Sequence, residues 1–130
     1  MGLFLKDINL KGKTALITGA TKGIGRGTAV AIAEAGGNII AIGRNQSELN
    51  SLGKIIKKYR VKYLSFNCDV NNFSSVKNFI SKLKRLDILV NNAGTNIPEP
   101  FLNVKKSSLE ALLNVNTKAV FNIAQLCANQ

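Results

Sequence analysis

The stretch that most constrains this chain is residues 18–25, Thr-Gly-Ala-Thr-Lys-Gly-Ile-Gly. The apolar run 13–17 before it predicts a short buried strand, and the small residues after it predict a helix. We expect Gly19 to adopt backbone angles that a Cβ forbids, and Gly25 to let the helix pack closely on the strand. Gly23 would let the main chain approach a diphosphate, while free N–H groups at the helix start face the anion. The stretch therefore predicts a nucleotide-binding turn.

The spacing of these glycines is distinctive. Three residues separate the first two and one residue separates the last two, which differs from GxGxxG and from the GxxxxGK[ST] phosphate loop. Three glycines at a tight strand-to-helix turn also have a purely structural explanation. The residues farther along the chain favour the phosphate site.

Strands and helices are predicted to alternate along the rest of the chain. Three more runs predict strands: 39–42, 61–67 and 86–90. Asn45 and Asn72 are expected to cap the two helices between them, and a Ser107/Glu110 capping box is expected to open the last helix. Such alternation implies a parallel sheet with right-handed crossovers. The expected fold is α/β, a Rossmann-type sheet of order 3-2-1-4 that is half of a doubly wound sheet.

Several motifs together make a family resemblance. The turn at 18–25 is combined with Asn91–Gly94 (NNAG) after the last predicted strand, with Asp69 after the third, and with Asn116 in the last helix. In these residues the chain closely resembles the short-chain dehydrogenase/reductase family, over a stretch from about residue 10 to residue 130. It is most similar to NADP-preferring members of the 3-oxoacyl-acyl-carrier-protein reductase and gluconate-dehydrogenase types.

The resemblance has consequences for the extent of the domain. In the family the chain continues for roughly as many residues again, so 1–130 would be a single NAD(P)-binding Rossmann domain, truncated at its C-terminus. The catalytic serine and the YxxxK tyrosine and lysine would lie in the remaining part. Neither Tyr59 nor Tyr63 is followed by lysine four residues later. The residues that protonate the carbonyl are therefore expected to be absent from this polypeptide.

Ligands of an open parallel sheet bind beyond the carboxyl ends of its strands, and the four strand-end motifs should meet there. The expected cofactor-binding residues are Gly19, Thr21, Lys22, Gly23, Ile24, Gly25, Arg44, Asn45, Asp69, Val70, Asn92, Ala93 and Gly94. The resemblance implies that Asp69 accepts a hydrogen bond from the adenine amino group, with Val70 beside the ring. It implies that Asn92, Ala93 and Gly94 line the ribose next to the nicotinamide. Asp69 precedes a helix, so it could also act partly as a cap.

Asn116 is the one catalytic-type residue that the resemblance transfers to this chain. In the family the matching asparagine interrupts the hydrogen bonding of its helix and holds a water on a proton path from the active lysine. Asparagine is common here, and Asn114 and Asn122 lie in the same predicted helix. Only the fit of the local sequence to the family's helix distinguishes Asn116 from them.

Charge predicts the choice of cofactor. A site for NAD usually places an acidic side chain after the second strand, whereas a 2′-phosphate needs cations. Arg44 occupies that place, Gly43 leaves room beside it, and Lys22 lies in the glycine turn. A guanidinium holds a phosphate with two hydrogen bonds and lysine adds a point charge. NADP(H) is therefore expected in preference to NAD(H), the alternative being that both cations are ordinary surface charges.

The composition bears on possible partners. A formal net charge of +11 with no histidine raises nucleic acid and anionic membranes as candidates. The lysines cluster in 54–58 and 82–85, spaced as solvated helix faces and not interleaved with aromatic residues. Neither nucleic acid nor a membrane is expected to bind. Cys68 and Cys127 form no CxxC pair, so both are expected to be reduced and no metal site is predicted.

The first ten residues and the apolar runs bear on location. The apolar residues Leu3–Leu5 are followed directly by Lys6 and Asp7, so the segment lacks the core of a signal peptide. No apolar run approaches the ~20 residues that span a bilayer. The expected location is cytoplasmic.

The resemblance implies an enzyme that moves a hydride between NADPH and a ketone or secondary alcohol, with a small-molecule substrate. The full-length protein would be a homodimer or homotetramer. Two other classes stay open at this point. One is a non-catalytic NADP-binding sensor or scaffold, and the other is a basic nucleic-acid module, which would bind DNA or RNA with steep salt dependence.

Overall fold

The structure, a computed structural model, describes residues 7–130. The segment Leu3–Leu5, weighed above as a possible signal peptide, lies outside this range. Parallel strands form one sheet in the order β3-β2-β1-β4, which confirms the predicted topology. Their bounds are β1 (Thr14–Thr18), β2 (Asn38–Gly43), β3 (Tyr63–Asn67) and β4 (Ile88–Val90).

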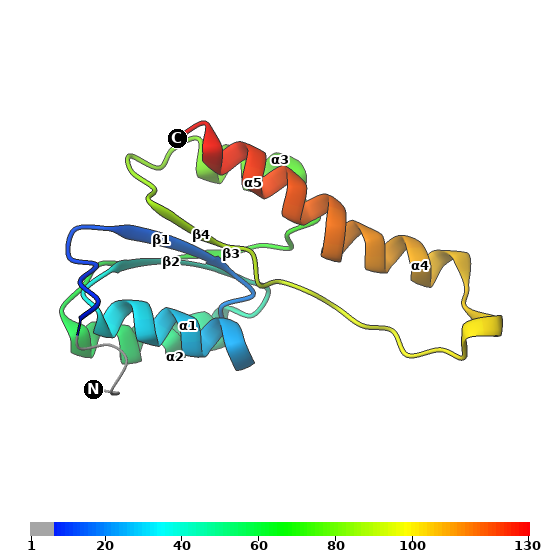
Figure 1. Ribbon diagram of the computed structural model, residues 1–130, viewed down its shortest axis with the longest axis horizontal. Helices are drawn as coiled ribbons and strands as arrows, with labels where there is room; N and C mark the ends of the chain where they lie inside the picture. The colour runs from blue at the N-terminus through cyan, green and yellow to red at the C-terminus, as the bar shows by residue number, and fades with distance from the viewer. Residues whose placement is uncertain (1–6) are drawn as a thin grey trace.

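Helices cover both faces of the sheet (Figure 1). Helices α1 (Gly23–Glu34) and α2 (Gln46–Ile56) lie on one face, and α3 (Phe73–Ile80) and α5 (Val120–Ala128) lie on the other. Both faces of the central strands are therefore buried, which explains why β1 and β2 are continuously apolar.

Two apolar cores result, one on each face of the sheet. Ala15 and Ile17 of β1 pack toward α1 and α2, while Leu16 between them packs toward α3 and α5. All three side chains have no exposed surface. The alternation follows from the pleat of the strand, which turns successive side chains to opposite faces.

Asparagine side chains cap two of the helices as predicted. The Oδ1 atom of Asn45 accepts a hydrogen bond from the Glu48 N–H at 3.1 Å, and Oδ1 of Asn72 accepts from the Ser75 N–H at 3.1 Å. Each cap satisfies an N–H group that has no partner within its own helix. The caps fix where the chain turns after β2 and after β3.

The predicted capping box at the start of the last helix is wrong. Helix α4 (Lys106–Leu113) begins one residue before Ser107, and the side chain of its N-cap residue, Lys105, makes no capping hydrogen bond. Ser107 therefore already lies within the first turn and cannot cap it. The carboxylate of Glu110 pairs instead with Lys118, at 3.5 Å.

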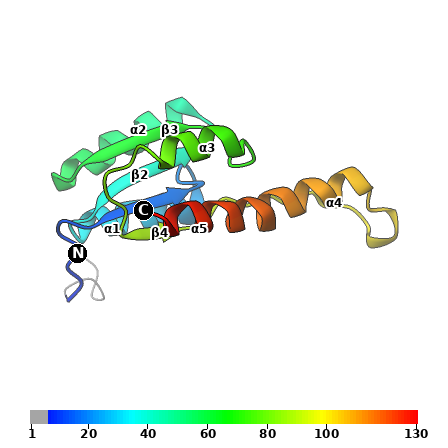
Figure 2. The same ribbon diagram turned by 90° about the horizontal axis from the view of Figure 1, so that it is seen from above.

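The chain after β4 leaves the sheet and forms an arm (Figure 1). It runs outward as a loop to a short 3-10 turn, Phe101–Asn103, and returns through α4, a π-helical segment at Asn114–Ala119, and α5. Figure 2 shows α4 and α5 as one continuous rod whose α4 end projects beyond the sheet. No helix within residues 7–130 is both long and apolar enough to cross a bilayer.

Candidate functional site

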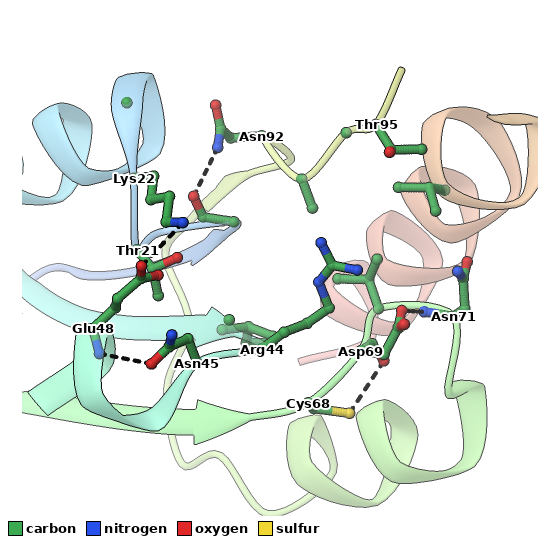
Figure 3. Close-up of a pocket in the computed structure, with 18 of the residues that line it drawn as sticks. Thr21, Lys22, Arg44, Asn45, Glu48, Cys68, Asp69, Asn71, Asn92 and Thr95 are labelled. Atoms are coloured by element: carbon green, nitrogen blue, oxygen red, sulfur yellow. Dashed lines mark hydrogen bonds and ion pairs between the residues drawn. The ribbon is translucent and has the colours of Figure 1, made fainter. Parts of the chain in front are cut away.

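A cleft of about 850 Å³ opens at the carboxyl ends of the strands. All of the predicted cofactor-binding residues except Ile24 and Gly25 line it. The four strand-end motifs therefore meet at one site, as the topology predicts. Figure 3 shows the cleft with side chains from the glycine turn on one side and from the ends of β2 and β3 on the other.

The glycine turn forms one wall of the cleft. Gly19 has a φ of 62°, in the left-handed region where residues with a Cβ are strained, as predicted. Helix α1 begins at Gly23, and the side chain of its N-cap residue Lys22 makes no capping hydrogen bond. No atom lies within 4 Å of the place where a Cβ on Gly23 would stand. The start of α1 therefore borders the cleft with open space beside Gly23, and a helix N-terminus in such a position can bind phosphate.

The two predicted residues that do not line the cleft have other positions. A Cβ on Gly25 would overlap the carbonyl oxygen of Gly19 and the side-chain amide of Asn92. Gly25 thus serves the close packing of helix and strand, as expected. Ile24 is 82% exposed and does not line the cleft.

Hydrogen bonds made by Asn92 hold the end of β4 against the end of β1. Its Nδ2 group donates hydrogen bonds to the carbonyl oxygens of Thr18 at 3.2 Å and Gly19 at 3.0 Å. In the other direction, Oγ1 of Thr18 accepts from the N–H groups of Asn92 and Ala93, at 3.1 and 3.0 Å. Because these four bonds hold both strand ends, the glycine turn and the NNAG segment keep a fixed separation.

The two predicted cations line the same cleft but differ in their pairing. Arg44 reaches into the cleft from the end of β2 (Figure 3). The Nζ atom of Lys22 instead lies 3.1 Å from Oε1 of Glu48, in the first turn of α2. Hydrogen bonding from Lys22, aided by Thr21, holds the pKa of Glu48 below its ordinary value. The carboxylate therefore stays charged and partly neutralises Lys22.

Asp69 lies at the opposite end of the cleft, after β3. One of its carboxylate oxygens, Oδ1, accepts a hydrogen bond from the Asn71 N–H at 2.9 Å. Its carbonyl oxygen accepts from the Cys68 thiol at 3.2 Å. Burial, and the charge of Asp69 beside it, raise the pKa of the Cys68 thiol, so that the thiol is a neutral part of the wall. Asp69 thus stabilises a local turn while its side chain lines the cleft.

Asn116 lies within the π-helical segment, where the regular α-helical bonding is interrupted. Its Nδ2 group donates to the carbonyl oxygen of Thr95 at 2.9 Å, and its Oδ1 accepts from the Thr95 N–H at 2.9 Å. This pair of bonds joins the last helix to the chain just after the NNAG segment. Asn116 does not line the cleft, although Ala111 and Val115 of the same rod do.

Comparison with known proteins decides the family. A family model described as short chain dehydrogenase matches residues 13–130. This chain belongs to the short-chain dehydrogenase family. It is 35% identical over 122 residues to L-xylulose reductase from Mesocricetus auratus, covering 94% of this chain and 48% of that protein. It is 38% identical over 114 residues to the 3-oxoacyl-[acyl-carrier-protein] reductase FabG of Rickettsia conorii, covering 88% and 46%.

Solved structures agree with this assignment. The chain superposes on a putative short-chain alcohol dehydrogenase from Sinorhizobium meliloti with a TM-score of 0.88. The two are 32% identical, and the match covers 94% of this chain and 50% of the other. Other similar structures include a carveol dehydrogenase in complex with NAD and a short-chain dehydrogenase in complex with NADPH. The chain spans about half the length of the curated relatives that it matches.

Sequence reasoning missed two polar residues of this short-chain dehydrogenase site. Thr18, 1% exposed, accepts the two main-chain bonds that fasten β4, and Glu48 holds Lys22. The sequence pattern of the cap at Asn45 includes Glu48 but does not show that it pairs with Lys22. The sequence contains a weak signal for Glu48 as a site residue. An acidic side chain in the first turn of a helix that follows a strand lies near the edge of the sheet where ligands bind. Among residues 7–130 no cluster of potential metal ligands occurs.

Proposed function

We propose that this chain is the cofactor-binding part of an NADP(H)-dependent oxidoreductase that interconverts a ketone and a secondary alcohol. The family membership supports the reaction class. The observation that carries the cofactor choice is Arg44, which reaches into the cleft at the place where an NAD site would have an acidic residue.

The residues of the cleft fit such a cofactor. The open space beside Gly23 and the start of α1 would hold the diphosphate. Arg44 would bind the 2′-phosphate with two charge-assisted hydrogen bonds. Asp69 and Val70 would bind the adenine, and the segment 92–94 would line the ribose next to the nicotinamide. When bound, the nicotinamide supplies or accepts the hydride.

Proton transfer to or from the carbonyl oxygen requires residues other than those that line the cleft. The family's serine and YxxxK residues have no counterpart in the 130 residues, so we expect cofactor binding without turnover by this chain. In the complete enzyme, the tyrosine would act as general acid or base toward the carbonyl. Asn116 would hold the helix and the loop at Thr95 in place beside the proton path.

The substrate class and the assembly are also part of the proposal. Relatives named L-xylulose reductase, D-erythrulose reductase and 3-oxoacyl-acyl-carrier-protein reductase favour a small polar carbonyl compound. Apolar side chains on the rod and its preceding turn are exposed, with Phe121 at 65% and Phe101 at 90%. Exposed apolar surface of this kind favours a homodimer or homotetramer.

Titration of the chain with NADPH and NADH, followed by nicotinamide fluorescence, tests the cofactor choice. We expect tighter binding of NADPH, and a loss of about 10- to 150-fold in NADPH affinity in Arg44→Met, since one hydrogen bond to a charged group contributes ~1.5–3 kcal/mol. NADH affinity should be nearly unchanged. The matched control is Lys58→Met, which removes the same charge from an exposed residue outside the cleft.

Two results would contradict the proposal. One is binding of neither nucleotide by the folded chain. The other is an equal loss of NADPH and NADH affinity in Arg44→Met, because that would mean that Arg44 does not recognise the 2′-phosphate.

A further inference from the structure

Lys22 is not a free cation in this cleft. Its ammonium lies 3.1 Å from the Glu48 carboxylate. The two side chains differ in exposure, since that of Lys22 is 77% exposed and that of Glu48 is 27% exposed. Both residues line the same cleft as Arg44. Two cations and the Glu48 carboxylate therefore line the cleft in which the 2′-phosphate is proposed to bind, and one of the cations is paired with that carboxylate.

Glu48 is held in place from several sides. Its main-chain N–H is bound by the Asn45 cap, and its carbonyl oxygen accepts a hydrogen bond from Nη1 of Arg26 at 3.5 Å. The same Arg26 atom donates to the carbonyl oxygen of Thr21 at 3.2 Å, and Nη2 donates to Oγ of Ser51 at 3.0 Å. These bonds tie the glycine turn to the first turns of α2. The main chain of Glu48 is thus held in place, and its side chain is less exposed than that of Lys22.

An anionic ligand must compete with Glu48 for Lys22. A phosphate bound between Lys22 and Arg44 shares the lysine ammonium with the carboxylate and is repelled by that carboxylate's charge. A ligand without a phosphate at this position does not need Lys22. Glu48 therefore disfavours the phosphorylated ribose relative to the unphosphorylated one.

We propose that Glu48 is a selectivity residue that occupies Lys22 and so limits the preference of the cleft for a 2′-phosphorylated adenosine. This inference rests on the proposed cofactor. It assigns different roles to the two cations. Arg44 makes most of the contacts that recognise the phosphate, and Lys22 contributes little because it is paired with Glu48. Removal of the carboxylate releases Lys22 and strengthens the discrimination.

The experiment compares 2′,5′-ADP with 5′-AMP by isothermal titration calorimetry, using wild type, Glu48→Gln, Lys22→Met and the double variant. We expect Glu48→Gln to tighten 2′,5′-ADP binding by about two- to fivefold, the range set by ion pairs of this exposure, and to leave 5′-AMP unchanged. In the Lys22→Met background, Glu48→Gln should give no such gain. The matched control is Glu110→Gln, which removes an exposed carboxylate paired with Lys118 outside the cleft.

Each other outcome has a defined meaning. Weaker or unchanged 2′,5′-ADP binding in Glu48→Gln overturns the inference, as does an equal change for both nucleotides or the same gain without Lys22. Glu48→Asp keeps an acidic side chain in the first turn of α2 and should tighten 2′,5′-ADP binding by a smaller factor than Glu48→Gln. This variant allows the test to be made even if Glu48→Gln does not fold. If folded wild type binds neither nucleotide, the proposed function fails. If wild type prefers 2′,5′-ADP and Glu48→Gln does not change that preference, only this inference fails.

Discussion

Gly25 and Gly27 lie two residues apart in α1, and the same substitution should have opposite effects at the two positions. A Cβ on Gly25 would overlap the Gly19 carbonyl oxygen and the amide of Asn92. A Cβ on Gly27 would meet no atom within 4 Å. Gly25 is buried and Gly27 is exposed. Comparing Gly25→Ala with Gly27→Ala therefore distinguishes the effect of the methyl group's steric contacts on stability from its effect on helix propensity.

The expected magnitudes follow from these contacts. Alanine is favoured over glycine within a helix by about 1 kcal/mol, so Gly27→Ala should stabilise the chain by roughly that amount. The same gain applies to Gly25→Ala but is opposed by overpacking, which costs typically about 1–3 kcal/mol. Because the helix contribution is common to both variants, their difference isolates the overlap. Gly25→Ala should be the less stable of the two by about 1–3 kcal/mol.

Urea unfolding followed by far-ultraviolet circular dichroism measures this difference. For a chain of this size it corresponds to a separation of roughly 1 M between the two midpoints. Displacement of Asn92 should also reduce nucleotide binding by Gly25→Ala, while Gly27→Ala keeps it. Equal midpoints for the two variants would refute the argument that Gly25 is required by close packing.

Three further predictions concern other parts of the chain. Asn116→Ala should lower the free energy of unfolding by about 1–3 kcal/mol, since both hydrogen bonds to Thr95 are lost, and should speed hydrogen exchange of the Thr95 amide. The pKa of Asp87 is lowered from 3.8 to about 2, chiefly by hydrogen bonding from Arg85, so its stabilising effect is complete above pH 3.8 and is lost as the pH falls toward 2. The unfolding free energy of Asp87→Asn should then decline less steeply than wild type between pH 4 and pH 2. Phe101 and Leu102, 90% and 91% exposed, should make the chain associate at micromolar concentration, and a monodisperse monomer in sedimentation velocity would contradict this.

The sheet was predictable because its signals are local. Each strand is a short apolar run that ends at a turn, and strands separated by helices can form only a parallel sheet with crossovers. Two boundaries were predicted two residues early, since β3 begins at Tyr63 and β4 at Ile88. Apolar pattern alone does not tell where ladder pairing starts.

Gly53 shows what sequence patterns leave out. Its position within α2 predicts a cost of about 1 kcal/mol relative to alanine. The benefit comes from a distant residue, because a Cβ there would stand 2.7 Å from Cε1 of Tyr63. The hydroxyl group of Tyr63 donates to the carbonyl oxygen of Leu49 at 2.7 Å. Only the packing of α2 on β3 brings these groups together.

The same distinction applies to the candidate site. The positions of Arg44, Asp69 and the NNAG segment in the cleft follow from topology alone, because each ends a strand. The pairing of Lys22 with Glu48 does not follow, since Lys22 precedes α1 and Glu48 lies in α2, and the two meet only when α1 and α2 pack side by side. The sequence therefore predicted that both cations lie at the cleft, but it did not predict that Lys22 pairs with Glu48.

Hydrogen bonds within the walls of the cleft explain why we expect this chain to bind a nucleotide by itself. Asn92 fixes the glycine turn against the end of β4, and Asn116 fixes the chain after it against the last helix. Both use a side-chain amide to hold main-chain groups, so the walls that would contact the diphosphate and the ribose next to the nicotinamide are formed before a ligand arrives. Preformed walls reduce the ordering cost of binding. Of residues 95–113, Thr95, Ile97 and Ala111 line the cleft. The loop and α4 otherwise run outward from the sheet (Figure 1). We therefore expect a low affinity, with the proposed selectivity of Arg44 and Glu48 retained.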